Sequence, residues 1–192
     1  MKSVVRNSRV NHYIDQILVK RHFKNVTVLM VFAFLLLSLL SVPVAAGNFS
    51  TGLLKGMDGS FHSLDEYTGN GQWTVVMIWA SDCHACNEEA KQYVKFHEAH
   101  KDKDAQILGV SMDGMEKKLE AEKFITRHGV TFPNLIESPE KVEALYSSLT
   151  GQAFIGTPTF LVYSPSGELR AAQVGAVPTE TIESFIDKES GK

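Results

Sequence analysis

Cysteine is scarce in this chain, which has only two cysteines among 192 residues. A protein held together by several disulfides is therefore excluded, and so is a zinc site made of cysteine ligands alone. The sequence also contains no internal repeat and no low-complexity segment. These absences leave a chain whose length suits one ordinary globular domain and little more.

Positive charge is scarce after residue 46. The whole chain has a formal net charge of −3, and residues 1–46 carry six lysines and arginines against one aspartate. Subtracting this excess of +5 from −3 leaves residues 47–192 at −8. Phosphate contacts need clustered lysines and arginines, so we expect no nucleic-acid partner for this acidic part.

Charge of either sign is absent from residue 25 to residue 54. Within this stretch, Val26–Leu40 reads VTVLMVFAFLLLSLL and follows the basic segment KRHFK. A basic flank before an apolar run is typical of an export signal or a membrane anchor, with the basic side left in the cytoplasm. We therefore expect the rest of the chain to be exported, to the periplasm or the extracytoplasmic face of the cytoplasmic membrane.

The sequence leaves two fates open for this apolar segment. The small residues of Val44–Ala46 favour cleavage by a signal peptidase after Ala46. Against cleavage, residues 26–46 supply roughly the 20 residues that a membrane-spanning helix needs. We therefore divide the chain into a basic leader (1–25), a signal peptide or membrane anchor (26–46) and a domain (47–192).

Strand-like apolar runs alternate along the domain with segments of helical spacing. A turn signal at residues 57–60 predicts a short hairpin, and the tight turn at 165–167 joins two strands that must be antiparallel. In the expected helix 116–128, Leu119, Phe124 and Ile125 should face inward. Together these elements predict an α/β fold with a mixed central sheet and helices on both faces. The expected strands are 73–79, 106–112, 159–164 and 168–175, and the expected helices are 86–100, 116–128, 140–149 and 179–188.

The two cysteines, Cys83 and Cys86, stand three positions apart. A structural zinc site would need two more ligands, and the candidates His97 and His100 belong to no tight ligand cluster. A structural disulfide is the second alternative, although closing so short a loop removes little entropy from the unfolded chain. The third alternative is a redox pair, and the position of the cysteines favours it.

The cysteine pair falls just after a buried strand and at the start of a helix. A helix N-terminus presents free N–H groups and a partial positive charge, and both stabilise a thiolate. Cys83, at the open end, should therefore be the attacking thiol. Cys86, one turn inside the helix, should be the resolving thiol that breaks the mixed disulfide.

Two segments carry a resemblance to a known family. IWASDCHACNEE (residues 78–89) resembles the active-site segment of thioredoxin-like proteins, and GTPTFLVYSPSGEL (residues 156–169) resembles their cis-proline loop and hairpin. The entry segment before them resembles that of the TlpA/ResA branch, the exported thiol-disulfide oxidoreductases. The resemblance covers about residues 50–190. It implies a thioredoxin fold, preceded here by the hydrophobic signal or anchor helix, and no cofactor beyond the redox-active disulfide Cys83–Cys86.

The resemblance also implies roles for residues outside the cysteine pair. Thr157 and Pro158 would form a cis peptide bond beside the disulfide, and their backbone would pair with an extended substrate. Trp79 belongs to the same substrate-binding region, although we expect it to pack beneath the site. Glu89, three residues after Cys86, stands where the TlpA/ResA branch carries a glutamate that handles protons for the thiols. The alternatives are that Pro158 is a trans proline in an ordinary turn and that Glu89 is a solvated surface glutamate.

Three residues around the cysteines are candidates for tuning their chemistry. Asp82 and Ala85 stand where the family commonly has tryptophan and proline. The carboxylate of Asp82 would disfavour the Cys83 thiolate, unless Asp82 or Ser81 simply caps the helix. His84, when protonated, would favour a neighbouring thiolate and make the disulfide more oxidising, unless it is merely exposed.

These observations predict an enzyme that exchanges disulfides with protein substrates. We expect it to act as a reductase, for example on apocytochrome c before haem attachment, and to need a membrane protein as electron donor or acceptor. An oxidase or isomerase with the same site is one alternative. A copper-handling thioredoxin-like protein would need Cys-x-x-x-Cys, one residue more than the spacing here. A peroxidase using Cys83 would need a Thr/Ser-rich cradle, of which only Ser81 is present.

Overall fold

The computed structural model of the protein describes residues 53–191. Its centre is a seven-stranded mixed sheet with the strand order β2-β1-β5-β4-β3-β6-β7. The central pairs β3–β4 and β4–β5 are parallel, whereas the outer pairs are antiparallel. The strands are β1 (Leu54–Gly56), β2 (Phe61–His62), β3 (Trp73–Trp79), β4 (Ala105–Ser111), β5 (Asn134–Ile136), β6 (Thr159–Tyr163) and β7 (Leu169–Val174).

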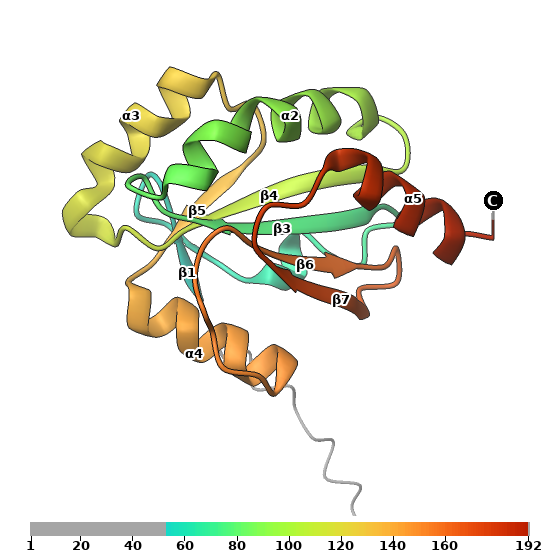
Figure 1. Ribbon diagram of the computed structural model, residues 1–192. Helices are drawn as coiled ribbons and strands as arrows, with labels where there is room; N and C mark the ends of the chain where they lie inside the picture. Colours follow the sequence, from blue (N-terminus) through green and yellow to red (C-terminus); the bar gives the residue numbers. More distant parts are fainter. Residues whose placement is uncertain (1–52, 192) are drawn as a thin grey trace, which may run out of the picture. The chain divides into compact units, whose positions relative to one another are not determined.

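Helices cover both faces of this sheet, as the sequence predicts (Figure 1). Three helices, α2, α3 and α5, pack on one face, and α4 packs on the other. Two short 3-10 helices, η1 and η2, lie in the connections. The helices are η1 (Leu64–Glu66), α2 (His84–His100), η2 (Met115–Lys117), α3 (Lys118–His128), α4 (Pro139–Thr150) and α5 (Thr179–Glu189).

Strand β3 forms the middle of the core, and every one of its residues is buried. Val75, Met77 and Trp79 share one hydrophobic cluster with the side chains of α2, while Val76 and Ile78 share the other with α4. A strand with helices on both faces reads as a continuous apolar run rather than as an alternation. This burial explains why the sequence of β3, WTVVMIW, is almost entirely apolar.

Strand pairing brings two distant loops to the same edge of the sheet. β3 and β4 run parallel, so the segments that follow them both leave at their carboxyl ends. β6 runs antiparallel to β3, with Thr159 opposite Ile78, so β6 begins where β3 ends. The loop after β3 and the loop before β6 are therefore neighbours in space, although about 80 residues separate them in the chain.

Most expected elements are present, but one expectation is wrong and one strand was not expected. The hairpin predicted from the turn at residues 57–60 is the antiparallel pair β1–β2. The prediction that Leu119 faces inward is wrong, because its exposed fraction is 58% and Ala121 and Phe124 take the buried positions of α3. The sequence analysis also missed β5, which lies between β1 and β4 in the sheet. A strand of three residues is too short to show a periodicity.

The basic leader (1–25) and the predicted signal peptide or anchor (26–46) lie outside the described residues. Among residues 53–191, no helix combines the length and the apolar character needed to cross a membrane.

His97 links α2 to the sheet through a buried hydrogen bond. Its exposed fraction is 5%, and its Nδ1 accepts the backbone N–H of Ile107 at 3.1 Å. An Nδ1 that accepts carries no proton, so the ring is neutral in this arrangement. Burial lowers the pKa of His97 from its ordinary value of 6.5.

The His97 hydrogen bond predicts that stability falls as the pH drops below about 6.5. The unfolded chain binds a proton at His97 more readily than the folded chain does, so acid favours unfolding. Urea unfolding at pH 7.5, 6.5 and 5.5 should give successively lower midpoints. His97→Gln should flatten this slope, with a remainder from His128, whose pKa burial also lowers. An unaltered slope in His97→Gln would contradict the assignment.

Candidate active site

The cysteine pair occupies the junction between β3 and α2. Cys83 is the N-cap residue of α2. Its backbone is extended, and the helix begins at the next residue, His84. Its Sγ accepts the backbone N–H of Cys86 at 3.1 Å. The two cysteines form a disulfide with their Cα atoms 5.2 Å apart, within the usual range. The strand-turn-helix context expected for this segment is confirmed.

The two sulfur-bearing residues differ in their exposure. Cys86 is buried, with an exposed fraction of 0%, and belongs to the core cluster beneath α2. Cys83 is only partly buried and packs at the margin of the same cluster. An incoming sulfur can therefore approach Cys83 but not Cys86. This difference is what the division into attacking and resolving thiol requires.

Two polar side chains hold the turn that precedes Cys83. The carboxylate of Asp113 accepts the backbone N–H of Ser81 at 3.0 Å and its hydroxyl at 2.8 Å. From the other side, the Asn87 amide donates to the carbonyl of Ser81 at 3.0 Å and to that of Cys83 at 2.8 Å. The turn is thus bound by β4 through Asp113 and by α2 through Asn87.

These contacts overturn one interpretation of the sequence. Neither Asp82 nor Ser81 caps α2, because the cap is the sulfur of Cys83 and the Ser81 hydroxyl is committed to Asp113. The Asp82 side chain is instead exposed. Its carboxylate stands one residue before Cys83 and has no helix-capping role.

His84 and Ala85 occupy the two positions between the cysteines. The His84 side chain is 88% exposed, and its Nε2 lies 3.2 Å from a carboxylate oxygen of Glu88, one turn further along α2. The negative charge of Glu88 therefore lies beside the His84 ring and would oppose the pull that a protonated ring exerts on the neighbouring sulfur. Ala85 is partly exposed in the first turn.

The loop before β6 lies beside the disulfide-bearing turn. The Thr157–Pro158 peptide bond is cis, as the resemblance implies. Continuing the pairing of Ile78 with Thr159 places Pro158 opposite Trp79, where β3 ends. The Pro158 carbonyl accepts the N–H of Gly175 at 2.8 Å, which ties the loop to the end of β7.

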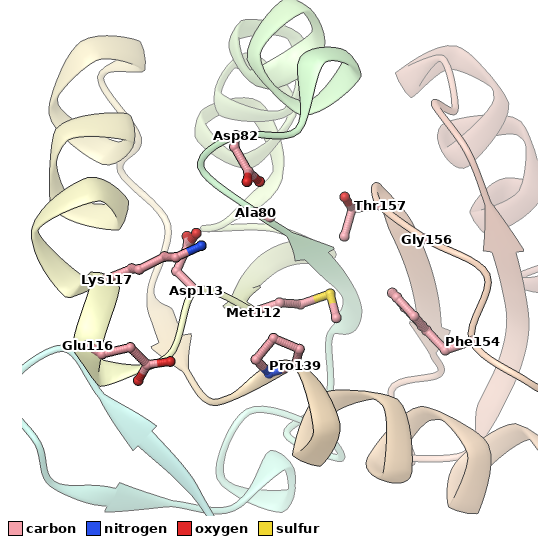
Figure 2. A pocket seen from close by; sticks show the side chains of 10 residues that line it. All are labelled: Ala80, Asp82, Met112, Asp113, Glu116, Lys117, Pro139, Phe154, Gly156 and Thr157. Carbon is pink, nitrogen blue, oxygen red and sulfur yellow. The ribbon is translucent and has the colours of Figure 1, made fainter.

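A cavity of about 290 Å³ opens between these two loops (Figure 2). Ala80 and Asp82 line it from the turn before Cys83, and Gly156 and Thr157 line it from the loop before β6. Asp113, at the end of β4, contributes to its wall. The disulfide-bearing turn and the cis-proline loop therefore border one shared cavity.

Trp79 lies beneath the site and not on its surface. Its exposed fraction is 1%, and its ring stacks on Phe124 of α3 with the centroids 4.2 Å apart. Its indole N–H donates to Asn134 at 3.0 Å. Including Trp79 among the substrate-binding residues is thus contradicted by its burial, whereas the expected packing role agrees with these contacts. It supports the end of β3 from below.

Glu89 follows Cys86 by three residues on α2 and is half-buried. Its carboxylate accepts a hydrogen bond from the amide of Gln92, which itself accepts the N–H of Thr179 at the start of α5 at 3.4 Å. Glu89 is thus linked to the start of α5 only through Gln92.

Asp113 is the site residue that the sequence analysis missed. It is buried, with an exposed fraction of 6%, and also accepts the Ser111 hydroxyl at 2.7 Å. One signal could have revealed it. Asp113 comes two residues after a buried strand, and the carboxyl ends of parallel neighbours meet at one edge, so a polar residue there should face the turn after β3.

Residues 45–172, more than half of the chain, match the AhpC/TSA family. The chain belongs to the AhpC/TSA family. This match covers the cysteine pair and the cis-proline loop, and ends within β7.

Two relatives of this AhpC/TSA-family protein align with it over most of both chains. Thiol-disulfide oxidoreductase ResA of Geobacillus kaustophilus is 28% identical over 146 residues, which cover 75% of this chain and 78% of the relative. Sporulation thiol-disulfide oxidoreductase A of Bacillus subtilis is 24% identical over 137 residues, which cover 71% and 78%. The expected enzyme class is confirmed: the protein is a thiol-disulfide oxidoreductase with a CxxC active-site pair.

A solved structure confirms the expected fold. The thioredoxin domain of a thiol-disulfide oxidoreductase from Bacteroides vulgatus superposes with a TM-score of 0.57 at 24% identity, covering 69% of this chain and 91% of that one. The described part of this AhpC/TSA-family protein therefore has a thioredoxin-like fold.

The contacts of Asp113 predict the effect of removing the Ser81 hydroxyl. Ser81→Ala should lower the free energy of unfolding by about 1–3 kcal/mol, because it leaves a buried carboxylate short of one donor. It should also slow thiol exchange at Cys83 by loosening the turn. Urea unfolding and the rate of reaction with a small disulfide measure the two effects. Ser184→Ala, which removes an exposed hydroxyl bound to its own helix, is the matched control and should change neither quantity. Equal results for the two variants would contradict the role of Ser81.

Proposed function

We propose that this protein exchanges disulfides with protein substrates outside the cytoplasm and that it acts there as a reductase. One observation carries the proposal. The partly exposed Cys83 caps α2 and is bonded to a fully buried Cys86. An accessible sulfur with an internal partner is the arrangement that two-step exchange needs.

The exchange proceeds in two balanced steps. The Cys83 thiolate attacks one sulfur of a client disulfide, the client S–S bond breaks, and the client's other sulfur leaves as a thiolate. The Cys86 thiolate then attacks Cys83, forms the disulfide seen in the structure and releases the client's first sulfur. Two electrons pass to the client, whose two thiolates take up two protons.

The surroundings of Cys83 support the reducing direction. A strongly stabilised thiolate makes a strong oxidant, because it lowers the free energy of the reduced form. Here the carboxylate of Asp82 opposes the thiolate, and the carboxylate of Glu88 lies 3.2 Å from the His84 ring, where it offsets positive charge. Both features favour the disulfide form, so the reduced protein readily gives up its electrons.

Glu89 and Pro158 take supporting roles in this proposal. Glu89, half-buried one turn after Cys86, is placed to relay protons for the thiols. The backbone of Thr157 and Pro158, at the end of β3 and beside the cavity, pairs with an extended client segment.

The apolar segment at residues 26–46, with its basic flank, supports export of the site to the extracytoplasmic face or the periplasm. In that oxidising compartment the client is a protein whose cysteines must stay reduced, such as apocytochrome c. A membrane protein then returns electrons to the Cys83–Cys86 pair after each cycle.

Trapping tests the exchange directly. Full-length Cys86→Ser should accumulate covalent adducts with envelope proteins when it is produced in an exporting bacterium, because the second step is blocked. The adducts should appear on a non-reducing gel, disappear with dithiothreitol and carry the client at Cys83. Equilibration of the wild-type protein with glutathione should give a potential nearer to the about −270 mV of thioredoxin than to the about −120 mV of a strong oxidant.

The matched control for the trap is Cys83→Ser, which keeps Cys86 but should form no adduct. Adducts with Cys83→Ser instead of Cys86→Ser would reverse the assigned roles. The absence of adducts from both variants would overturn protein exchange, and a potential near that of the strong oxidant would overturn the reducing direction.

A further inference from the structure

The cavity beside the cysteine pair has two chemically different walls (Figure 2). Met112, Pro139 and Phe154 form an apolar wall on the side of α4 and the loop before β6. One side of the cavity is therefore apolar.

The opposite wall carries charge of predominantly one sign. Three carboxylates, those of Asp82, Asp113 and Glu116, line the cavity against the single ammonium of Lys117 (Figure 2). Asp113 is buried and held by Ser81, whereas Asp82 and Glu116 are exposed and can meet an incoming group. The cavity is thus acidic on one side and apolar on the other.

The place of the cavity fixes which part of a client could enter it. Asp82 stands next to Cys83, and Thr157 stands next to Pro158. A client cysteine joined to Cys83 would bring its own neighbours along the chain to this cavity, since an extended chain advances only about 3.3–3.6 Å per residue. A side chain that enters the cavity would therefore belong to a residue close in sequence to the client's reacting cysteine.

We propose that this cavity binds the side chain of a lysine or arginine next to, or two positions from, the client cysteine. This inference rests on the proposed exchange with protein substrates. The methylene stem of such a side chain packs on Met112 and Phe154, while its cationic end meets the carboxylates of Asp82 and Glu116. No other natural side chain combines a long apolar stem with a positive end. The net charge of −8 over residues 47–192 adds a longer-range attraction for basic client segments.

The inference can be tested with peptides that differ at one position. Each peptide has a single cysteine capped with 2-nitro-5-thiobenzoate, and a neighbouring residue is lysine, norleucine or glutamate. Attack by the reduced full-length protein releases the coloured thiol, so absorbance gives the rate for each peptide. The lysine peptide should react about tenfold faster than the norleucine peptide at low ionic strength, and faster still than the glutamate peptide. Added salt should shrink this preference.

Substitutions in the acidic wall separate recognition from thiol reactivity. Glu116→Gln and Asp82→Asn should each reduce the preference for lysine over norleucine to about threefold or less. The preference is a ratio of rates at the same thiol, so any change in the reactivity of Cys83 cancels. Glu120→Gln is the matched control, since Glu120 is an exposed glutamate of the neighbouring α3 that does not line the cavity. It should keep the full preference.

The outcomes distinguish this inference from the proposed function. Equal rates for the three peptides, a faster norleucine peptide, or a lysine preference that survives in both acidic-wall variants would overturn the cavity's role and leave disulfide exchange intact. A failure of all peptides to release the coloured thiol, or equal release by Cys83→Ser, would instead overturn the proposed exchange at Cys83.

Discussion

One hydrogen bond constrains the arrangement of the whole site: the N–H of Cys86 donates to the sulfur of Cys83 at 3.1 Å. A sulfur can accept this bond only from the cap position, where the backbone is extended and the helix has not yet begun. β3 must therefore end at Trp79, so that the turn can deliver residue 83 to the start of α2.

The surrounding elements converge on that turn. Asp113 holds it from the end of β4, and Asn87 holds it from α2. Asn87 is itself fixed by α3, because its side-chain oxygen lies 3.2 Å from an Arg127 nitrogen and 2.9 Å from His128 Nε2. Sheet and helices thus share one polar network around a reactive loop, which keeps the sulfur in place before a substrate arrives.

Features that are local along the chain, including the two hairpins, could be predicted from the sequence, whereas contacts between strands that no tight turn joins could not. The redox pair, its strand-turn-helix context and the cis bond at Pro158 follow from short segments and their resemblance to a family. Asp113 shows in the sequence only as a polar residue just after a buried strand, and its contact with Ser81 also depends on the pairing of β3 with β4. Leu119 was misplaced because its apolar character was given more weight than helical spacing: it stands five positions, about 140° around a helix, from Phe124 and so lies off the buried face.

The position of Cys86, one helical turn from Cys83, has a consequence for the covalent intermediate of the proposed exchange. A dissolved thiol such as glutathione must diffuse to Cys83 before it can attack a client bonded there. Cys86 is already one helical turn away and needs no such encounter, which corresponds to a very high effective concentration. How long enzyme and client stay joined is therefore decided inside the protein, largely independently of the thiol concentration of the compartment.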